Sequence, residues 1–264
     1  MKTPRILHQT WKTTDIPDHL QAYVDSCKTI HPEYQYRLWT DRDLKEFIHS
    51  HYPQFAKAYD SFQVNIERVD FARYAILHKI GGVYADLDIQ CTKNLDELTA
   101  LNVPILGSEP IEHRERLYNN EPYVLCNALM ISPPGEPVWL HIMHNIVQKY
   151  KKSANPVYNT GPMAVTRAFK DNVGAFDHVL LISACSFYPQ TDHMSRKSQN
   201  GVPHISRECD LKDAFTIHRW AHTWVPGAKQ NGDGSGSAHG YVYLALTLLA
   251  LLIVTMFLQN KYKR

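Results

Sequence analysis

The segment from Val64 to Ile89 constrains the fold more than any other part of this sequence. Its first part carries apolar residues at helical spacing, namely Ile66, Val69, Ile76, Leu77 and Ile80. This spacing predicts a helix over Val64–Ile80 with one apolar face. Gly81 follows in the position of a left-handed C-cap, and Val83–Ile89 has the composition of a buried strand. A helix that leads directly into a buried strand is a unit of α/β folds.

The rest of the chain continues this alternation. Strands are predicted at Arg5–Trp11, Tyr34–Trp39 and Tyr123–Ser132, and helices at Pro17–Ile30, Asp41–His51 and Pro137–Tyr150. Asp41 is a candidate N-cap for its helix. The alternation predicts an α/β fold with a mostly parallel central sheet.

The C-terminal part changes character. A Gly/Ser-rich stretch at 228–240 reads as a flexible linker, and about 18 uncharged residues follow at 241–258. That run is long enough for a transmembrane helix, with a buried core helix as the alternative. The expected organisation is a catalytic domain at 1–227, the linker, a transmembrane helix at 241–258 and a basic tail at 259–264. The N-terminal residues lack the apolar run of a signal peptide, and the membrane orientation stays open.

Charge and cysteine content exclude some classes of protein. The net charge of +2 and the absence of a basic stripe argue against a nucleic-acid partner. The five cysteines are odd in number and contain no Cys-x-x-Cys pair, which disfavours a zinc site and excludes a complete disulfide framework. This content favours a reducing compartment.

Asp86 and Asp88 are the strongest candidates for chemistry. In a strand, residues two apart point to the same face, so both carboxylates would lie together at the end of a buried strand. A divalent cation would relieve their repulsion, and oxygen ligands suit Mg²⁺ or Mn²⁺. Two solvated acids in a turn would give the same pattern.

Other candidates surround this pair. Asp70 and Arg73 are three residues apart on one helix face, either at a site or as a surface ion pair. Trp11 could stack on a nucleobase or belong to the core. Either His218 or His222 could complete a metal shell.

Three segments resemble a known family. PRILHQTWK at Pro4–Lys12, VDFARYAILHKIGGVYADLD at Val69–Asp88 and IHRWAHTW at Ile217–Trp224 resemble the retaining glycosyltransferases of family 32, which carry a DXD motif. That family includes fungal mannosyl inositolphosphorylceramide synthases and bacterial capsular and lipopolysaccharide sugar transferases. The resemblance extends from about residue 4 to 226.

The resemblance implies a GT-A fold, a nucleotide-diphosphate sugar donor and a Mn²⁺ or Mg²⁺ ion. It implies that Asp88 is the main metal ligand and that Asp86 contacts both the metal and the donor. His218 would reach the metal or the diphosphate, while His222 receives no role. Asp86, Asp88 and Arg73 are the expected catalytic residues.

The remaining roles also come from the resemblance. The donor would be bound by Trp11, Thr10, Asp70, Arg73, Tyr84 and Asp86. Asn127 and Gly161, in the Thr160-Gly161-Pro162 turn, would face the acceptor.

The expected reaction is metal-dependent, retaining transfer of a hexose, with GDP-mannose as the first choice of donor. The acceptor would be a membrane-associated molecule such as inositol phosphorylceramide. A single-pass membrane location, in the Golgi or endomembranes of a eukaryote, would follow from the anchor. Alternatives are a UDP-sugar with a glycan or protein acceptor, a metal-dependent phosphohydrolase or nuclease, and a non-enzymatic sugar-binding membrane protein.

Overall fold

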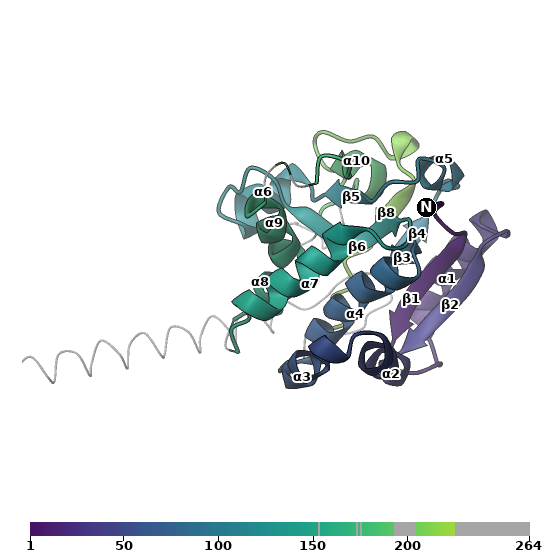
Figure 1. Cartoon of the computed structure of the whole chain (residues 1–264). Helices are drawn as coiled ribbons and strands as arrows, with labels where there is room; N and C mark the ends of the chain where they lie inside the picture. Colours follow the sequence, from purple (N-terminus) through teal and green to yellow (C-terminus); the bar gives the residue numbers. More distant parts are fainter. Residues whose placement is uncertain (153, 173, 175, 193–203, 225–264) are drawn as a thin grey trace, which may run out of the picture. The chain divides into compact units, whose positions relative to one another are not determined.

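A computed structural model describes residues 1–224, except 153, 173, 175 and 193–203. The chain divides into two units, one of residues 1–199 with 203–220 and the other of 200–202 with 221–264. All helices and strands given below belong to the first unit (Figure 1).

A six-stranded sheet forms the centre of this unit, in the order β2-β1-β3-β6-β5-β7. These strands are β1 (Ile6–Trp11), β2 (Gln35–Thr40), β3 (Gly82–Ala85), β5 (Ile105–Ser108), β6 (Leu125–Ser132) and β7 (Leu180–Ile182). β6 is antiparallel to both of its neighbours, whereas the pairs β1–β2, β1–β3 and β5–β7 are parallel. The prediction of an α/β fold with a mostly parallel sheet is confirmed, with β6 as the reversed strand.

A second sheet has two antiparallel strands, β4 (Ile89–Cys91) and β8 (Thr216–His218). The longer helices are α1 (Asp18–Ile30), α2 (Asp41–His51), α3 (Pro53–Ser61), α4 (Asn65–Lys79), α7 (Pro137–Lys149) and α9 (Pro162–Lys170). Shorter segments are α5 (Asp96–Thr99), α6 (Ile111–Leu117), α8 (Pro156–Asn159), α10 (Ala184–Phe187) and the 3₁₀ turn η2 (Leu211–Asp213). Among the described residues, each helix and strand predicted from the sequence is present within a few residues, apart from the strand Val83–Ile89.

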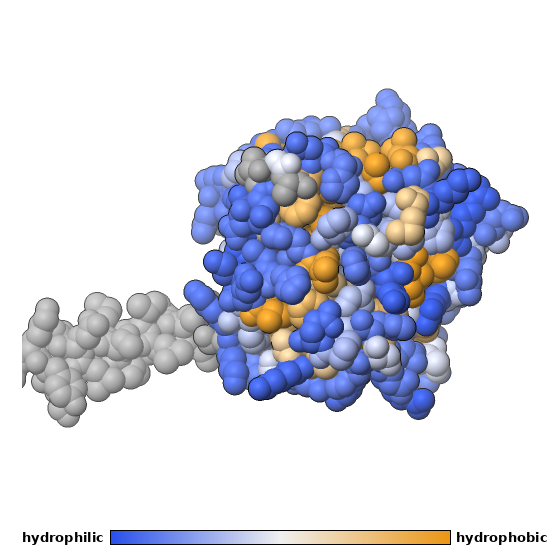
Figure 2. All heavy atoms as spheres, viewed as in Figure 1, coloured by the Kyte–Doolittle hydropathy of each residue, from blue (hydrophilic) through white to orange (hydrophobic). Residues whose placement is uncertain are grey.

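Both faces of the central sheet are covered, because successive strand residues point into two different apolar clusters. In β3, Val83 and Ala85 pack into a cluster with Leu7 of β1, while Tyr84 points into the cluster of α2, α4 and α7. Figure 1 shows α4 and α7 side by side across one face of the sheet. On the molecular face in view in Figure 2, apolar residues form small groups among hydrophilic ones.

α4 is buried more completely than its apolar stripe predicts. Residues 70–77 are all buried, including the charged Asp70 and Arg73. The helix ends as predicted, since Gly81 has a φ of +73° and its N–H donates to the Leu77 carbonyl. Gly82 has a φ of +103°, and a Cβ there would lie 2.7 Å from the Ile6 carbonyl oxygen. The chain therefore needs glycine where α4 turns into β3.

Two local predictions were wrong. Asp41 is the first helical residue of α2 and not its cap, because the Thr40 hydroxyl accepts the Asp43 N–H and the Asp43 carboxylate accepts the Thr40 N–H. The strand expected over Val83–Ile89 stops at Ala85. A turn follows, closed by the Ile89 N–H donating to the Asp86 carbonyl at 3.0 Å.

The cysteines also correct an expectation. Cys27 is bonded to Cys91 and Cys185 to Cys209, while Cys126 is free and buried. The reducing compartment favoured by the odd count is therefore not supported, since disulfides persist in oxidising environments. The partners are 64 and 24 residues apart, so their proximity depends on the folded chain.

The predicted membrane location is corrected as well. No helix among the described residues is long and apolar enough to cross a bilayer. The segment 241–258, on which the single-pass prediction depended, lies outside the described residues.

His8 supplies a prediction about acid stability. Its ring is fully buried, Nε2 lies 2.9 Å from the Gly81 carbonyl oxygen, and Nδ1 accepts the Trp39 indole N–H. Burial lowers the pKa of His8 from 6.5 to about 4, against the effect of the Gly81 hydrogen bond. Between those values the unfolded chain takes up a proton that the folded chain does not. The stability that neutral His8 provides is therefore complete above pH 6.5 and declines toward pH 4, by about 3 kcal/mol.

The measurement is urea unfolding of the protein and of His8→Gln at pH 7 and 4.5. The difference between their unfolding free energies should narrow at the lower pH by about 2–3 kcal/mol. An unchanged difference would contradict the neutral, buried ring.

Candidate active site

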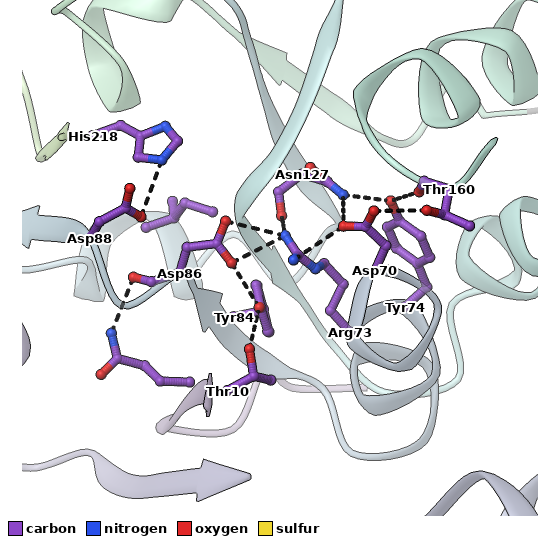
Figure 3. Close-up of polar contacts among 12 residues, drawn as sticks. Thr10, Asp70, Arg73, Tyr74, Tyr84, Asp86, Asp88, Asn127, Thr160 and His218 are labelled. Atoms are coloured by element: carbon purple, nitrogen blue, oxygen red, sulfur yellow. Dashed lines mark hydrogen bonds and ion pairs between the residues drawn. The ribbon is translucent and has the colours of Figure 1, made fainter. Parts of the chain in front are cut away.

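The site begins where β3 ends. The Asp86 N–H still donates to the Ala128 carbonyl of β6, but Leu87 and Asp88 form the turn that leads into β4. β4 pairs with β8, and this pairing sets Ile89 opposite His218. The turn and the strand pair together bring Asp88 Oδ1 to 3.2 Å from His218 Nε2 (Figure 3).

Asp86, Asp88 and His218 form a group with the composition of a metal site. One ligand atom from each lies within 4.8 Å of the other two. Burial raises the pKa of Asp86, and the Asp88 charge adds to this against the opposing effect of Arg73. His218 Nδ1 is buried and has no hydrogen-bond partner among the described residues. Two clustered carboxylates with the Nε2 of an imidazole beside them fit a divalent cation.

The charge on His218 follows from the same neighbours. Burial alone would lower the pKa of its imidazole, but Asp88, through its charge and hydrogen bond, outweighs burial and raises the pKa. In the absence of a cation, a protonated His218 would therefore balance part of the carboxylate charge. A bound cation would replace that proton.

Arg73 connects Asp86 to Asp70. Its guanidinium is 2% exposed, with Nη2 3.1 Å from Asp70 Oδ1 and Nη1 3.2 Å from Asp86 Oδ1. Nη1 also donates to the Asn127 carbonyl at 2.8 Å. The surface ion pair considered for Asp70 and Arg73 is excluded, because both side chains lie inside the protein between α4 and the sheet edge.

Asp70 is held by neutral donors on its other side. The Thr160 hydroxyl donates to Oδ2 at 2.8 Å and the Asn127 amide to Oδ1 at 2.9 Å. Burial raises the pKa of Asp70 to about 6, although the charge of Arg73 opposes the shift. These contacts bring a residue of α4, one of β6 and the Thr160 turn to a single carboxylate (Figure 3).

Tyr84 and Thr10 support Asp86 from β3 and β1. The Tyr84 hydroxyl donates to Asp86 Oδ1 at 2.8 Å, and the Thr10 hydroxyl lies 2.9 Å from the Tyr84 oxygen. Because the tyrosine proton is used by Asp86, the Thr10 hydroxyl donates to Tyr84. Two residues predicted to bind a donor thus contact the Asp86 carboxylate or its hydrogen-bond partner.

Trp11 and Gly161 are the remaining predicted site residues of the first unit. Trp11 ends β1, is half-buried, and has the Lys12 ammonium 5.6 Å from its ring centre. Gly161 packs closely, since a Cβ there would lie 3.1 Å from Val157 Cα and 3.5 Å from Asp70 Oδ2. His218 joins the carboxylate pair. His222 belongs to the second unit.

Two residues of the site, Tyr74 and Gln9, had no predicted role. The Tyr74 hydroxyl accepts the Asn127 amide N–H at 2.8 Å and donates to the Thr160 carbonyl at 2.7 Å. The Gln9 amide donates to the Asp86 carbonyl at 3.3 Å. Tyr74 had a signal in the sequence, because it follows Asp70 by four residues and therefore shares its helix face.

The fold and site define an α/β protein with a candidate metal site just after the C-terminal end of β3, a strand in the middle of its central sheet. Residues 17–103 match the family described as glycosyltransferase sugar-binding region containing DXD motif. Over these residues the chain is similar to the DXD-motif glycosyltransferases, as the resemblance in its sequence predicted. The matched region includes Asp70, Arg73, Asp86 and Asp88.

Three proteins with similar sequences have names that describe the transfer of a sugar. Inositol phosphoceramide mannosyltransferase 3 of Schizosaccharomyces pombe is 37% identical, over 61% of this chain and 43% of the relative. A mannosyl phosphorylinositol ceramide synthase of Saccharomyces cerevisiae is 36% identical, over 79% and 48%. An uncharacterized glycosyltransferase of Acanthamoeba polyphaga mimivirus is 24% identical, over 86% and 85%. The chain spans about half the length of the two fungal relatives.

Proposed function

We propose that this protein is a metal-dependent glycosyltransferase of GT-A type that moves a hexose, with retention, from a nucleotide-diphosphate sugar. The observation that carries the proposal is the convergence of Asp86, Asp88 and His218 beside the buried Asp70–Arg73 pair. The relationship to the DXD-motif family supports the same reaction class.

Each residue has a role that its contacts suggest. Asp88, Asp86 and His218 would hold Mn²⁺ or Mg²⁺, which acts as a Lewis acid toward a diphosphate leaving group. Asp86 is the more accessible carboxylate, with 27% of its side chain exposed against 6% for Asp70, so we assign it the donor contact. Arg73 is enclosed by protein groups and acts through Asp86 and Asp70, whose carboxylates it orients.

The substrates are proposed from the relatives. Their names specify mannosyl transfer to inositol phosphoceramide, so we propose GDP-mannose as the donor and an inositol phospholipid of this type as the acceptor. Trp11 and Thr10 would lie on the nucleotide side. Asn127 and Gly161 would lie toward the acceptor.

The test measures nucleotide-diphosphate release from GDP-mannose and a panel of UDP-sugars, with and without Mn²⁺, in the presence of inositol phosphoceramide. We expect release from GDP-mannose that requires both the metal and the acceptor. If a UDP-sugar is turned over and GDP-mannose is not, the donor is a UDP-sugar and the assignment of GDP-mannose is wrong. Nucleotide-diphosphate release at the same rate with and without the acceptor would indicate a hydrolase. Sugar binding that does not need the metal and leads to no turnover would contradict the proposal that the protein is an enzyme.

A further inference from the structure

A basic cavity lies beside the Thr160 turn, outside the group described above. Its volume is about 400 Å³, and it lies among residues of α8, the end of α7 and Arg167 of α9. Three cationic side chains line it, those of Lys149, Lys151 and Arg167, and its lining contains no carboxylate. Among the described residues, none of the three forms an ion pair.

Two hydrogen bonds fix the Arg167 guanidinium beside the cavity. Its Nε donates to the Asn145 amide oxygen at 3.0 Å and its Nη1 to the Tyr158 carbonyl at 2.9 Å. Nη2 is buried and has no hydrogen-bond partner among the described residues. Burial lowers the pKa of Arg167, and the charge of Asp171 opposes this only in part. The guanidinium keeps its positive charge, which no carboxylate in the cavity lining neutralises.

Consecutive residues join this cavity to the proposed active site. Asn159 lines the cavity, and its amide donates to Glu67 of α4 at 2.8 Å. The next residue, Thr160, donates its hydroxyl to Asp70 Oδ2 at 2.8 Å (Figure 3). A group bound among the three cations would therefore lie against the same turn that contacts Asp70.

We propose that this cavity binds the phosphate of an anionic acceptor, and so selects an acceptor whose sugar-accepting ring carries a phosphoester. The proposal rests on the proposed function. A phosphoester offers several acceptor oxygens and a negative charge, which match the positive charges of Arg167 and of the exposed Lys149 and Lys151. The acceptors in the names of the fungal relatives contain a phosphate.

The experiment uses the full chain, the double variant Lys149→Gln/Lys151→Gln and the control Lys152→Gln. Lys149, Lys151 and Lys152 are all exposed, and Lys152 does not line the cavity, so the substitutions should leave the fold intact. Calorimetry first measures binding of glycerophosphoinositol and of inorganic phosphate. Transfer assays then give KM for glycerophosphoinositol, for neutral myo-inositol and for the donor.

We expect the double variant to weaken glycerophosphoinositol binding and raise its KM by about tenfold, less so at high salt. KM for myo-inositol and for the donor should not change, and Lys152→Gln should match the parent protein. Equal binding by parent and double variant would overturn the proposal. So would parent binding of inorganic phosphate that equals binding of glycerophosphoinositol, because the cavity would then take any phosphate.

The two proposals fail differently. If no donor is turned over, the proposed function fails, and calorimetry still decides whether the cavity binds a phosphoester. If transfer occurs with equal KM for the charged acceptor in both proteins, only the cavity assignment fails.

Discussion

Replacing Asp88 with alanine is expected to lower nucleotide-sugar turnover by about a thousandfold or more, because a metal's electrostatic stabilisation of a leaving group is worth several kcal/mol. Asp88 and His218 face each other across the β3–β4 turn and β8, and without Asp88 a cation would keep only Asp86 and His218 of the three ligands. Steady-state rates over a range of Mn²⁺ concentrations measure the effect. The same variant should lose Mn²⁺ binding followed by electron paramagnetic resonance.

Asp213→Ala provides the matched control, since this exposed carboxylate lies only five residues before His218. It should retain full turnover and metal binding. Full activity in Asp88→Ala would remove the metal-site interpretation, and loss of activity with unchanged Mn²⁺ binding would move Asp88 from metal ligand to another role.

Among the substitutions proposed here, Arg73→Met should lower the free energy of unfolding the most. The change leaves Asp70 and Asp86 buried without their shared cation, and breaking a buried ion pair in this way costs about 3–5 kcal/mol. The pKa of Asp70 is already raised to about 6 with Arg73 present and would rise further without it. The folded variant would thus hold a proton that the unfolded chain releases, so its stability should increase as the pH falls.

Urea unfolding at pH 8 and pH 5 measures both effects. The destabilisation by Arg73→Met should be smaller at pH 5 than at pH 8. Arg42→Met is the control, because Arg42 pairs with Glu46 on the surface, where such a pair contributes at most about 1 kcal/mol. A loss in Arg73→Met no larger than in Arg42→Met, or one that grows on acidification, would contradict the buried network.

Local patterns sufficed to predict most of the scaffold. The apolar spacing of α4, the glycine that ends it and the strand at β1 follow from residues close in sequence, and each lies within a residue or two of its expected bounds. The prediction that the carboxylates of Asp86 and Asp88 lie close together is also confirmed, although not by the strand that was expected. It arises from a turn after Ala85, because the chain leaves the ladder to form β4 with β8.

What the sequence did not reveal depends on distant partners. Asp70 and Arg73 have the spacing of a surface pair, and only the contacts from Asn127 and Thr160, 57 and 90 residues from Asp70, show that they are buried. The reversal of β6 has no local signature, since a strand buried on both faces has the same composition in either direction. The residues alone left His218 and His222 as alternatives; the family resemblance favoured His218, and the pairing of β8 with β4 places it beside Asp88.

The bond between Cys27 and Cys91 bears on how the protein is handled. Cys91 ends the strand that pairs with β8, so this crosslink ties the His218 strand pair to α1 and closes 64 residues of chain. In a chain-entropy treatment, the crosslink of a loop of that size stabilises the folded protein by about 4 kcal/mol. Thiol reductants in a purification buffer, or a host whose cytosol keeps thiols reduced, would remove this restraint. If a preparation loses activity in such a buffer, we infer that the β4–β8 pair has lost its restraint although Asp88 and His218 are chemically unchanged.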